Sequence, residues 1–269
     1  MVLSIIITSW NTIKYLQQCI ESLKAVNSDT EIIVIDNNST DGSKEWLRTQ
    51  KHIILIENNE NLGYAAACNQ GIKIAKGSFV LLLGSDTIVH DTSVLGKCIE
   101  FLKSKPDAGA VSCKLLNPDG STQNSIKRFP KLINGFYTYL SLDLLNKHYD
   151  MADFTYDRTI EIEQADSTFL MIKKEVLALI KGFDERYRIL YNDVDLCRRI
   201  LNTGYKIYFL HTCSITHYGS TSTRRADFRV RKIMYGDIYR YYRNNFGYKA
   251  LFLYPILAVR LLLVSTIKP

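Results

Sequence analysis

Residues 79–87 read FVLLLGSDT and residues 32–38 read IIVIDNN, two uninterrupted apolar runs that each end in polar residues. A run without polar alternation is typical of a strand that is covered on both faces, as in a parallel sheet. Further β-branched runs lie at residues 3–8, 52–57 and 108–113. Together these runs predict an α/β fold on a mainly parallel sheet.

Helical patterns lie between the predicted strands. Leu16, Ile20 and Leu23 follow the i, i+4, i+7 spacing of one helix face, behind Asn11 or Thr12 as a cap. The alternation of strands and helices implies right-handed crossovers, which place helices on both faces of the sheet.

Polar residues follow the carboxyl ends of the predicted strands. Ligands of open α/β sheets bind beyond these ends. We therefore expect five elements of sequence to converge on one crevice, namely Thr8, Asn11, Asp36, Asn38 and residues 84–87.

The regular pattern weakens after Asn117, and residues 121–156 are rich in aromatic side chains with little periodicity, as a substrate-facing region would be. Regular elements then return. They are a strand at 165–173, a helix at 175–180, a helix at about 193–202 and a strand at 206–211.

The chain resembles the inverting family 2 glycosyltransferases in seven segments, which in order are IIITSWN, EIIVIDNNSTDGS, NLGYAAACNQGIKIAKG, FVLLLGSDT, GFDE, NDVDLCRR and THYGSTS. The resemblance extends from Leu3 to about Ser220 and is strongest to the rhamnosyltransferase-like branch that builds bacterial surface polysaccharides. It implies a GT-A fold over residues 1–220, with a nucleotide-binding half at 1–117 and an acceptor and catalytic half at 118–220.

Asp36 stands at the end of a predicted strand, where its carboxylate can accept the N3 proton of uracil or thymine, a proton that cytosine lacks. The resemblance implies this role, with Thr8, Asn11 and Asn38 beside it, and hence a UDP-sugar or dTDP-sugar donor. An Asp before Asn and Ser is also a common turn former or helix cap, and this alternative stays open.

Asn61 and Gly63 precede a helix that contains Asn69, so backbone amides near a helix N-terminus are available to a diphosphate. A glycine needed only for a tight loop is the alternative. The chain has neither G-x-G-x-x-G nor G-x-x-x-x-G-K, which argues against nicotinamide binding and ATP-type phosphoryl transfer.

Asp86 follows a wholly apolar strand at the position where the family carries the last Asp of a metal-binding motif. The resemblance implies that Asp86 binds Mg²⁺ or Mn²⁺ bridged to the donor diphosphate, with His217 as a second ligand; hard cations of this kind take carboxylate and phosphate oxygens. Gly84 stands where the family has Asp or Asn, so one side chain of the motif is missing. A structural role is the alternative for His217.

Asp193 matches the Asp of the family's Glu-Asp pair, with Asn192 in place of the Glu. The resemblance implies that Asp193 is the general base that takes the proton of the acceptor hydroxyl, which direct displacement at the anomeric carbon requires. Asp195 is expected to be a structural partner. The alternative is that both carboxylates only satisfy first-turn amides.

The C-terminal residues 221–269 form a basic tail. They carry ten Lys and Arg against two Asp, a net charge of +8. The whole chain has a formal charge of +7, so residues 1–220 have a net charge of about −1. Because Tyr and Phe alternate with these cations before an apolar stretch, we expect a helical tail at an anionic membrane surface. The stretch contains Pro255 and Arg260 and is short for a spanning helix. A helix pair packed on the domain or on a second subunit, and so a homodimer, is the alternative, and no nucleic-acid motif accompanies the charge.

Six cysteines are scattered without C-x-x-C or zinc spacing, so they are expected to be buried in a reducing compartment. The N-terminus lacks the pattern of a signal peptide, which favours a cytoplasmic location, peripheral at the inner face of the cell membrane.

The sequence therefore predicts an inverting, metal-dependent glycosyltransferase with a glycan or lipid-linked glycan acceptor. Arg224 and Arg225 are a hypothetical closing segment over the diphosphate. Two alternative functions remain, one a different enzyme and the other a protein without catalytic activity. A nucleotidyltransferase would need a glycine-rich basic loop where this chain has SWNT, and a catalytically inactive membrane-bound subunit is suggested by Gly84 and Asn192.

Overall fold

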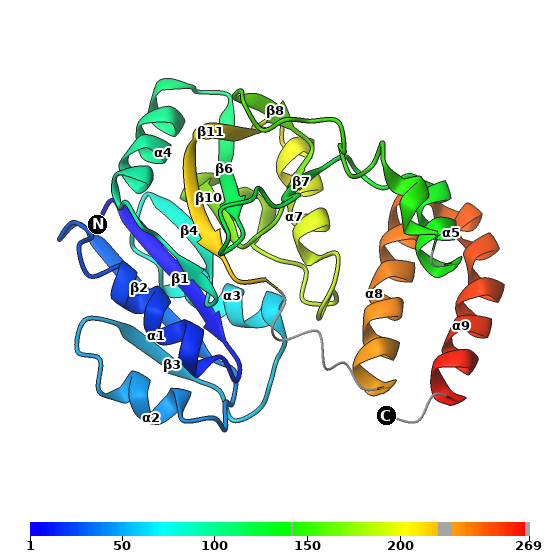
Figure 1. Ribbon diagram of the computed structural model, residues 1–269, viewed down its shortest axis with the longest axis horizontal. Helices are drawn as coiled ribbons and strands as arrows, with labels where there is room; N and C mark the ends of the chain where they lie inside the picture. The colour runs from blue at the N-terminus through cyan, green and yellow to red at the C-terminus, as the bar shows by residue number, and fades with distance from the viewer. Residues whose placement is uncertain (141, 220–227, 267–269) are drawn as a thin grey trace.

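The computed structural model describes residues 1–140, 142–219 and 228–266 (Figure 1). In these residues a nine-stranded sheet has the order β3–β2–β1–β4–β10–β6–β11–β5, with β8 beside β11. Its strands are β1 (Leu3–Ser9), β2 (Thr30–Asp36), β3 (Ile54–Glu57), β4 (Phe79–Gly84), β5 (Thr87–Ile88), β6 (Ala108–Leu116), β8 (Ile160–Ile162), β10 (Phe169–Lys173) and β11 (Lys206–His217). A separate ribbon pairs β7 (Ile126–Lys127) with β9 (Gln164–Ala165).

The mostly parallel arrangement is confirmed. Strands β3, β2, β1 and β4 run parallel to one another, and β11 runs parallel to β6. Strand β10 is antiparallel to both β4 and β6, and therefore joins the two parallel blocks.

Two strand predictions are wrong in their extent. The single strand predicted at 165–173 is broken, because Asp166 Oδ1 accepts hydrogen bonds from the backbone N and the Oγ1 of Thr168, at 2.8 and 2.6 Å, and turns the chain between β9 and β10. The strand predicted at 206–211 continues to His217 through an irregularity between Leu210 and Ser214.

Helices cover both faces of the sheet, as predicted. The helices are α1 (Ile13–Ser22), α2 (Ser43–Arg48), α3 (Tyr64–Ile74), α4 (Ser93–Ser104), α5 (Leu132–Leu140), α6 (Lys174–Ile180), α7 (Asn192–Asn202), α8 (Phe228–Phe246) and α9 (Tyr254–Thr266), with 3₁₀ turns η1 (Asp143–Asn146) and η2 (Gly247–Leu253). Alternate residues of one strand face opposite cores: Ile5 packs in the core under α1 and α4, and Ile6 packs in the core under α3, α6 and α7.

Thr12 occupies the N-cap position of α1, as one of the two predicted caps, but its side chain makes no capping hydrogen bond. Asp41 Oδ2 instead accepts the backbone N–H of Ile13 at 2.8 Å. The six cysteines are all free and buried.

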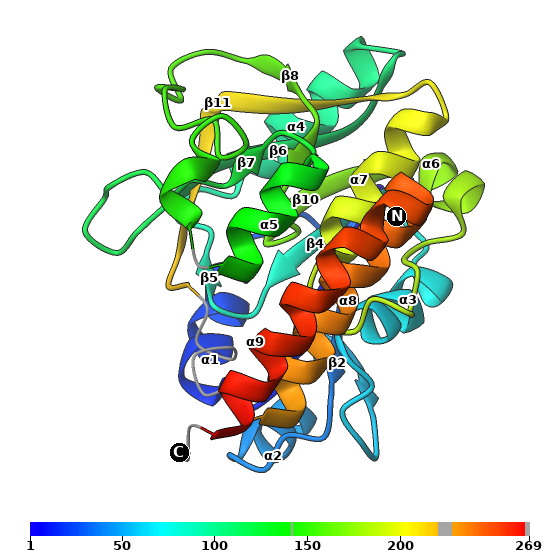
Figure 2. The same cartoon turned by 90° about the vertical axis from the view of Figure 1, so that its right-hand side faces the viewer.

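A third core joins the C-terminal helices to the middle of the chain. Helices α5, α8 and α9 with η2 form a layer at one end of the molecule (Figures 1 and 2). Tyr139 of α5 and Tyr187 are buried together with Tyr241 and Tyr242 of α8. The tail therefore packs on the rest of the chain, as one alternative anticipated, and no helix of the described residues is long and apolar enough to cross a bilayer.

Candidate active site

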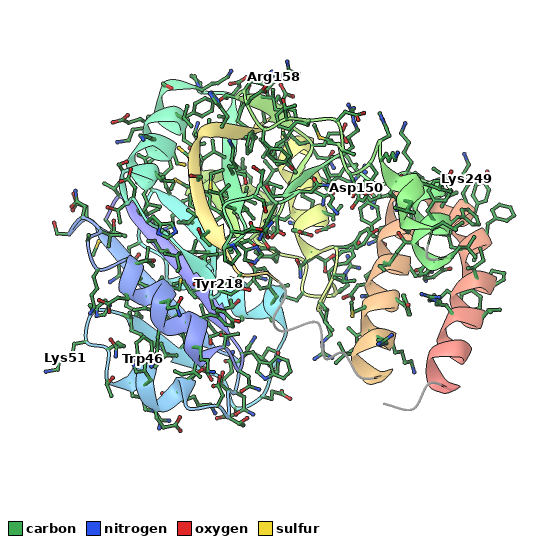
Figure 3. All side chains as sticks on the ribbon, viewed as in Figure 1. Trp46, Lys51, Asp150, Arg158, Tyr218 and Lys249 are labelled. Atoms are coloured by element: carbon green, nitrogen blue, oxygen red, sulfur yellow. The ribbon has the colours of Figure 1, made fainter. Side chains whose placement is uncertain are left out.

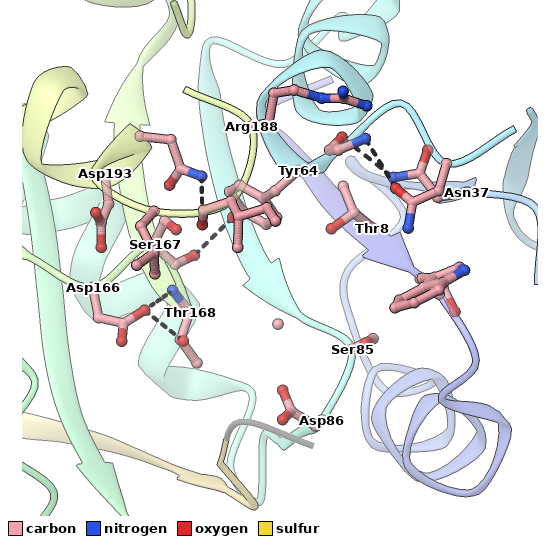
Figure 4. Close-up of a pocket in the computed structure, with 18 of the residues that line it drawn as sticks. Thr8, Asn37, Tyr64, Ser85, Asp86, Asp166, Ser167, Thr168, Arg188 and Asp193 are labelled. Carbon is pink, nitrogen blue, oxygen red and sulfur yellow. Dashed lines mark hydrogen bonds between the residues drawn. The ribbon is translucent and has the colours of Figure 1, made fainter. Parts of the chain in front are cut away.

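A cleft of about 620 Å³ opens at the carboxyl ends of β1 and β4. One side, which we call the sheet wall, consists of Thr8, Ser9, Trp10, Asn37 and residues 84–86. The opposite side, the loop wall, consists of residues 166–168 and 188–193. Figure 4 shows Asp166 and Asp193 facing Thr8 and Asn37 across the cleft, with Asp86 at the end between them.

Strand register assembles the sheet wall. Thr8 lies opposite Gly84, and Ser9 lies opposite Asp36, on the two sides of β1. Asp36 does not itself line the cleft, and it is fully buried beside Ser9, which does. Its Oδ1 accepts the backbone N–H of Ser39 at 2.8 Å, whereas Oδ2 has no hydrogen-bond partner among the described residues. A buried carboxylate oxygen without a donor is costly, so it is a candidate acceptor for a ligand N–H.

Asn11 and Asn38 do not line the cleft. Asn11 Oδ1 accepts the backbone N–H of Thr40 at 2.8 Å, and Asn38 Oδ1 accepts a hydrogen bond from Lys44 Nζ at 2.6 Å. Both residues have a left-handed backbone, with φ of 54° and 65°. They shape the loops after β1 and β2.

The amides at the start of α3 already have hydrogen-bond partners in the structure. Asn61 and Gly63 line the cleft, but Asn61 Oδ1 already accepts the N–H of Gly63 at 2.9 Å. The carbonyl of Arg188 accepts the next amide, that of Tyr64, at 3.4 Å. Gly63 has φ of 87°, and a Cβ there would lie 2.8 Å from the Arg188 carbonyl oxygen. Glycine is thus needed for the close approach of the loop wall, and these two amides are not free for a diphosphate.

Asn69, which was predicted to bind the cofactor, does not line the cleft. Asn69 Nδ2 donates to the Phe183 carbonyl and to Glu185 Oε1, and its Oδ1 accepts the N–H of Phe183. These three hydrogen bonds join α3 to the loop that follows α6.

Asp86 and His217 meet at the end of the cleft, where His217 Nε2 lies 3.4 Å from Asp86 Oδ1. Gln123 donates through Nε2 to the carbonyl of His217 and to Asn117 Oδ1, so its Oε1 is left to accept from His217 Nδ1, at 2.7 Å. This network keeps a hydrogen on Nδ1, so Nε2 is the nitrogen that faces Asp86. Nε2 donates to Asp86 when the imidazole is protonated, and it offers a lone pair to a cation when the imidazole is neutral.

The Asp86 and His217 pair fits a divalent cation that also binds a diphosphate. An imidazole nitrogen and a carboxylate oxygen converge here, and Mg²⁺ and Mn²⁺ complete their coordination with phosphate and water. Burial alone lowers the pKa of His217, but the hydrogen bond and charge of Asp86 and the charge of Asp166 raise it overall. No cluster of three acidic, His or Cys side chains suited to a metal occurs in the described ranges.

Gly84 is closely surrounded. A Cβ at this position would lie 3.1 Å from Asp86 Oδ1 and 3.2 Å from Thr168 Cγ2. The Gly84 N–H is bonded to the Thr168 carbonyl at 2.9 Å. Thr168 of the loop wall therefore lies against the position where the family's motif has a side chain and this chain has none.

Asp193 lies in the first turn of α7, where its Oδ1 accepts the N–H of Val194 at 2.8 Å. Burial and then the negative charge of Asp166 raise the pKa of Asp193 to about 7, and Lys127 opposes this shift. A carboxylate with such a pKa is suited to take a proton near neutral pH. Asp195 lies on the same helix and pairs with Arg199 Nε at 2.7 Å.

Three contributors to the site were not predicted. Asp166 and Arg188 line the loop wall. Asp237 of α8 is 1% exposed, and its Oδ2 accepts the N–H groups of Ile189 and Leu190 at 2.8 and 3.1 Å. The C-terminal layer thus holds the loop wall in place. Arg224 and Arg225 lie outside the described residues.

The model of the glycosyl transferase family 2 matches residues 4–163, more than half of the chain. The chain belongs to this family. It is 26% identical over 226 residues to the O-antigen biosynthesis protein RfbC of Myxococcus xanthus, covering 81% of this chain and 17% of that protein. It is 23% identical over 240 residues to the N-acetylglucosaminyl-diphospho-decaprenol L-rhamnosyltransferase of Mycobacterium tuberculosis, covering 83% and 78%.

Among solved structures, a mannosyltransferase from Pyrobaculum calidifontis in complex with GDP-Man and Mn²⁺ superimposes with a TM-score of 0.60 at 17% identity, over 99% of this chain and 76% of that one. This similarity confirms the GT-A fold of the glycosyltransferase. The family match ends at residue 163, so Asp193, His217 and the C-terminal layer lie beyond it.

Proposed function

We propose that the chain transfers a sugar, with inversion and with the aid of Mg²⁺ or Mn²⁺, from a UDP-sugar or dTDP-sugar to a hydroxyl of a glycan. The observation that carries this proposal is the opposition of two groups in one cleft. The Asp86 and His217 pair suits a cation at the leaving diphosphate, and Asp193 on the loop wall suits a base on the other side (Figure 4).

In the proposed reaction Asp193 accepts the proton of the acceptor hydroxyl as the acceptor oxygen bonds to the anomeric carbon. The bond from that carbon to the diphosphate oxygen breaks on the opposite face, which inverts the configuration in one step. A bound divalent cation supplies charge neutralisation at the leaving diphosphate. Asp86 and His217 Nε2 would hold that cation, with Gln123 fixing the imidazole.

The choice of uracil or thymine rests on Asp36. Its partnerless Oδ2 can accept the N3–H of either base if the base enters beside Ser9, the strand neighbour of Asp36 that lines the cleft. The fold alone does not select the base, since the mannosyltransferase with the same fold is bound to GDP-Man. The rhamnosyl transfer and the decaprenol-linked acceptor named for the mycobacterial relative make dTDP-rhamnose and a lipid-linked glycan the first substrates to test.

Isothermal titration with UDP, dTDP and GDP, each with and without Mn²⁺, tests this proposal. We expect UDP or dTDP to bind with Mn²⁺ and the Asp86→Ala variant to lose the metal-dependent part, while Asp91→Ala, an exposed carboxylate beyond β5, stays like the wild type. Absence of nucleotide binding under every condition would favour the inactive membrane-bound subunit. Preference for GDP would contradict the assignment of Asp36.

We also propose that the C-terminal layer lies on an anionic membrane. Five large apolar side chains at the outer end of this layer are more than half exposed, an arrangement more typical of an interaction surface than of free solvent. They are Leu144, Leu145, Tyr248, Leu251 and Phe252, with exposed fractions of 57% to 87%.

Charge supports a lipid occupant for this face. Lys249 of η2 is exposed and projects from the end of the layer (Figure 3). Three further cations are exposed on neighbouring segments, namely Lys131 before α5, Lys147 after η1 and Arg243 of α8. Asp237, the one acidic residue from 228 to 269, is buried. Apolar and cationic side chains together suit the headgroup region of an anionic bilayer.

Vesicle sedimentation tests the membrane proposal with phosphatidylcholine vesicles that contain or lack phosphatidylglycerol. We expect binding only to the anionic vesicles, and a loss of roughly tenfold or more in the double variant Leu251→Asn, Phe252→Ser. Leu179→Asn, which removes a 63% exposed leucine of α6, should bind like the wild type. A stable dimer that covers this face in solution, or equal binding by all variants, would contradict the proposal.

A further inference from the structure

The Asp86 and His217 pair lies where β5 and the end of β11 meet, and we call residues 84–89 and 216–218 the edge ribbon. In the described residues β5 ends the sheet and pairs with β11 at two positions, one of which joins His217 to Thr87. One further bond, from the backbone N–H of Tyr218 to the carbonyl of Asp86 at 2.9 Å, extends the pairing. So short a pairing is marginal by itself, and β5 therefore needs support from another element.

Helix α1 lies directly beside the edge ribbon (Figure 2). Four of its side chains have the i, i+3, i+4, i+7 spacing of one helix stripe and contact the edge ribbon, namely Tyr15, Gln18, Cys19 and Ser22. The apolar side chains of Leu16 and Ile20 pack in the core. The helix therefore presents one stripe to the sheet and a neighbouring stripe to the edge ribbon.

Two sets of contacts hold the β5 side of the edge ribbon. Cys19 Sγ lies 3.6 Å from the Gly84 carbonyl oxygen and 3.7 Å from Thr87 Oγ1, and Thr87 Oγ1 donates to the same carbonyl at 2.8 Å. Ser22 Oγ accepts the backbone N–H of Val89 at 3.1 Å. These contacts fix the chain before and after the carboxylate that faces the imidazole.

Tyr218 holds the β11 side of the edge ribbon. Its Oη donates to Gln18 Oε1 at 2.8 Å, and its ring lies on that of Tyr15, with 4.9 Å between the ring centroids. The backbone of Tyr218 bonds to Asp86 and directly follows His217. A shift of the Tyr218 side chain would therefore move the two members of the pair relative to each other.

We infer that Tyr218 and Gln18 are positioning residues for the divalent cation. Two ligands of one octahedral Mg²⁺ lie about 3 Å apart, and Asp86 Oδ1 is 3.4 Å from His217 Nε2. Gln123 sets the rotation of the imidazole, whereas Tyr218 and Gln18 set this separation from outside the cleft. The inference rests on the proposed function, because it takes Asp86 and His217 as the ligands.

Electron paramagnetic resonance of Mn²⁺ in the presence of UDP tests the inference. Tyr218→Phe keeps the ring on Tyr15 and removes the donor, and Gln18→Leu removes the acceptor. Each should weaken Mn²⁺ binding roughly two- to tenfold, the effect of one side-chain hydrogen bond. Gln18→Glu keeps an acceptor oxygen and should keep the wild-type affinity for Mn²⁺. Gln17→Leu, on the exposed face of α1, is the control and should also bind Mn²⁺ like the wild type.

Two comparisons separate positioning from a general disturbance of the fold. Affinity for UDP without metal should be the same in all variants, because neither residue lines the cleft. Tyr218→Phe combined with Gln18→Leu should lose no more Mn²⁺ affinity than either change alone, since both remove the same bond. Equal losses of Mn²⁺ affinity and metal-free UDP affinity, additive losses in the double variant, or Gln18→Glu as weak as Gln18→Leu would overturn the inference.

Hydrogen exchange of the Tyr218 backbone N–H is a test that needs no metal. This N–H bonds to the Asp86 carbonyl, so its exchange should accelerate roughly two- to tenfold in Gln18→Leu and stay at the wild-type rate in Gln18→Glu. Unchanged exchange in Gln18→Leu would overturn the inference. Failure of the wild type to bind Mn²⁺ with any nucleotide would instead count against the proposed function, and the exchange rates would then decide the inference.

Discussion

The two walls of the cleft differ in what holds them in place. The sheet wall is positioned by neighbouring parallel strands, since the register that pairs β1 with β2 and β4 also brings Thr8, Asp36 and Gly84 together. The loop wall depends on contacts between distant parts of the chain. Gly63 packs on the carbonyl of Arg188, and Asp237 binds the amides of Ile189 and Leu190.

This difference suggests a division of labour. Parallel strands of a buried sheet are rigid, which suits recognition of a constant nucleotide. A loop fastened at a few points can be altered without rebuilding the sheet, which suits an acceptor that differs among family members. The division predicts that changes in the loop wall affect turnover or stability and spare nucleotide affinity.

The largest expected effect is on turnover in Asp193→Asn. The variant keeps the side-chain shape and loses the proton acceptor, so kcat should fall by roughly 10²- to 10⁴-fold, the usual contribution of a general base. Affinity for UDP or dTDP should stay the same, as measured by titration. Asp195→Asn is the matched control on the same helix, because Asp195 pairs with Arg199 and does not line the cleft. Equal losses in the two variants would show that the helix, and not the base, was disturbed.

The next effect concerns Gln123, which lies outside the cleft lining and holds His217. Gln123→Met removes the acceptor of the Nδ1 hydrogen bond, so the imidazole is free to rotate or to change tautomer. We expect Mn²⁺ affinity to fall roughly 10- to 100-fold, which is typical when the partner of a ligand histidine is lost. Electron paramagnetic resonance of bound Mn²⁺ in the presence of UDP measures this directly. Unchanged Mn²⁺ affinity would mean that His217 is not a ligand.

The sheet wall was predictable because its residues follow apolar strands at once, and parallel strands end together. Asp166 was missed because the apolar run at 169–173 was extended backwards over it. The sequence did indicate a turn here. Asp166 and Thr168 are two residues apart, the spacing at which an Asp carboxylate accepts the backbone N–H of the second residue after it. His217 was proposed as a ligand only through the family resemblance. The register shift between Leu210 and Ser214 interrupts the strand pattern, so the sequence did not predict that β11 continues to His217.

Asp237 shows the limit of sequence patterns. It is surrounded in sequence by arginines and tyrosines, so the composition predicted a surface tail and gave no indication of a buried carboxylate. Only the tertiary packing of α8 on the loop before α7 brings it to the amides of Ile189 and Leu190. A single acidic residue in an otherwise basic helix is nevertheless visible in the sequence, and it indicates a candidate for a buried carboxylate.

We expect Asp237→Ala to destabilise the protein by about 2 kcal/mol, since it leaves two buried amides without an acceptor. Thermal unfolding measures the loss. The loop wall should loosen as well, so kcat should fall several-fold while nucleotide affinity stays near the wild-type value. Asp237→Asn keeps one acceptor oxygen and should lose less stability. If both variants reduced nucleotide affinity as strongly as kcat, the two walls would not be independent.

The smallest expected effect is a shift in pH dependence on replacing Asp166. The rate should rise with pH to a plateau as Asp193 ionises, with a midpoint near 7. Asp166→Asn keeps an oxygen for the turn at Thr168 and removes the neighbouring negative charge, so the midpoint of kcat/KM should move below 7.

The pH dependence of the free energy of unfolding is an independent test of how the charge of Asp166 affects Asp193. A carboxyl group whose pKa is raised from 3.8 to about 7 by folding contributes stability below pH 4 that is lost as the pH rises through 7. Because Asp166→Asn reduces that shift, the variant should gain stability relative to the wild type between pH 4 and pH 8, as followed by thermal unfolding. A midpoint that stays at 7 with no relative gain would remove Asp166 as the cause and leave burial alone to set the pKa of Asp193.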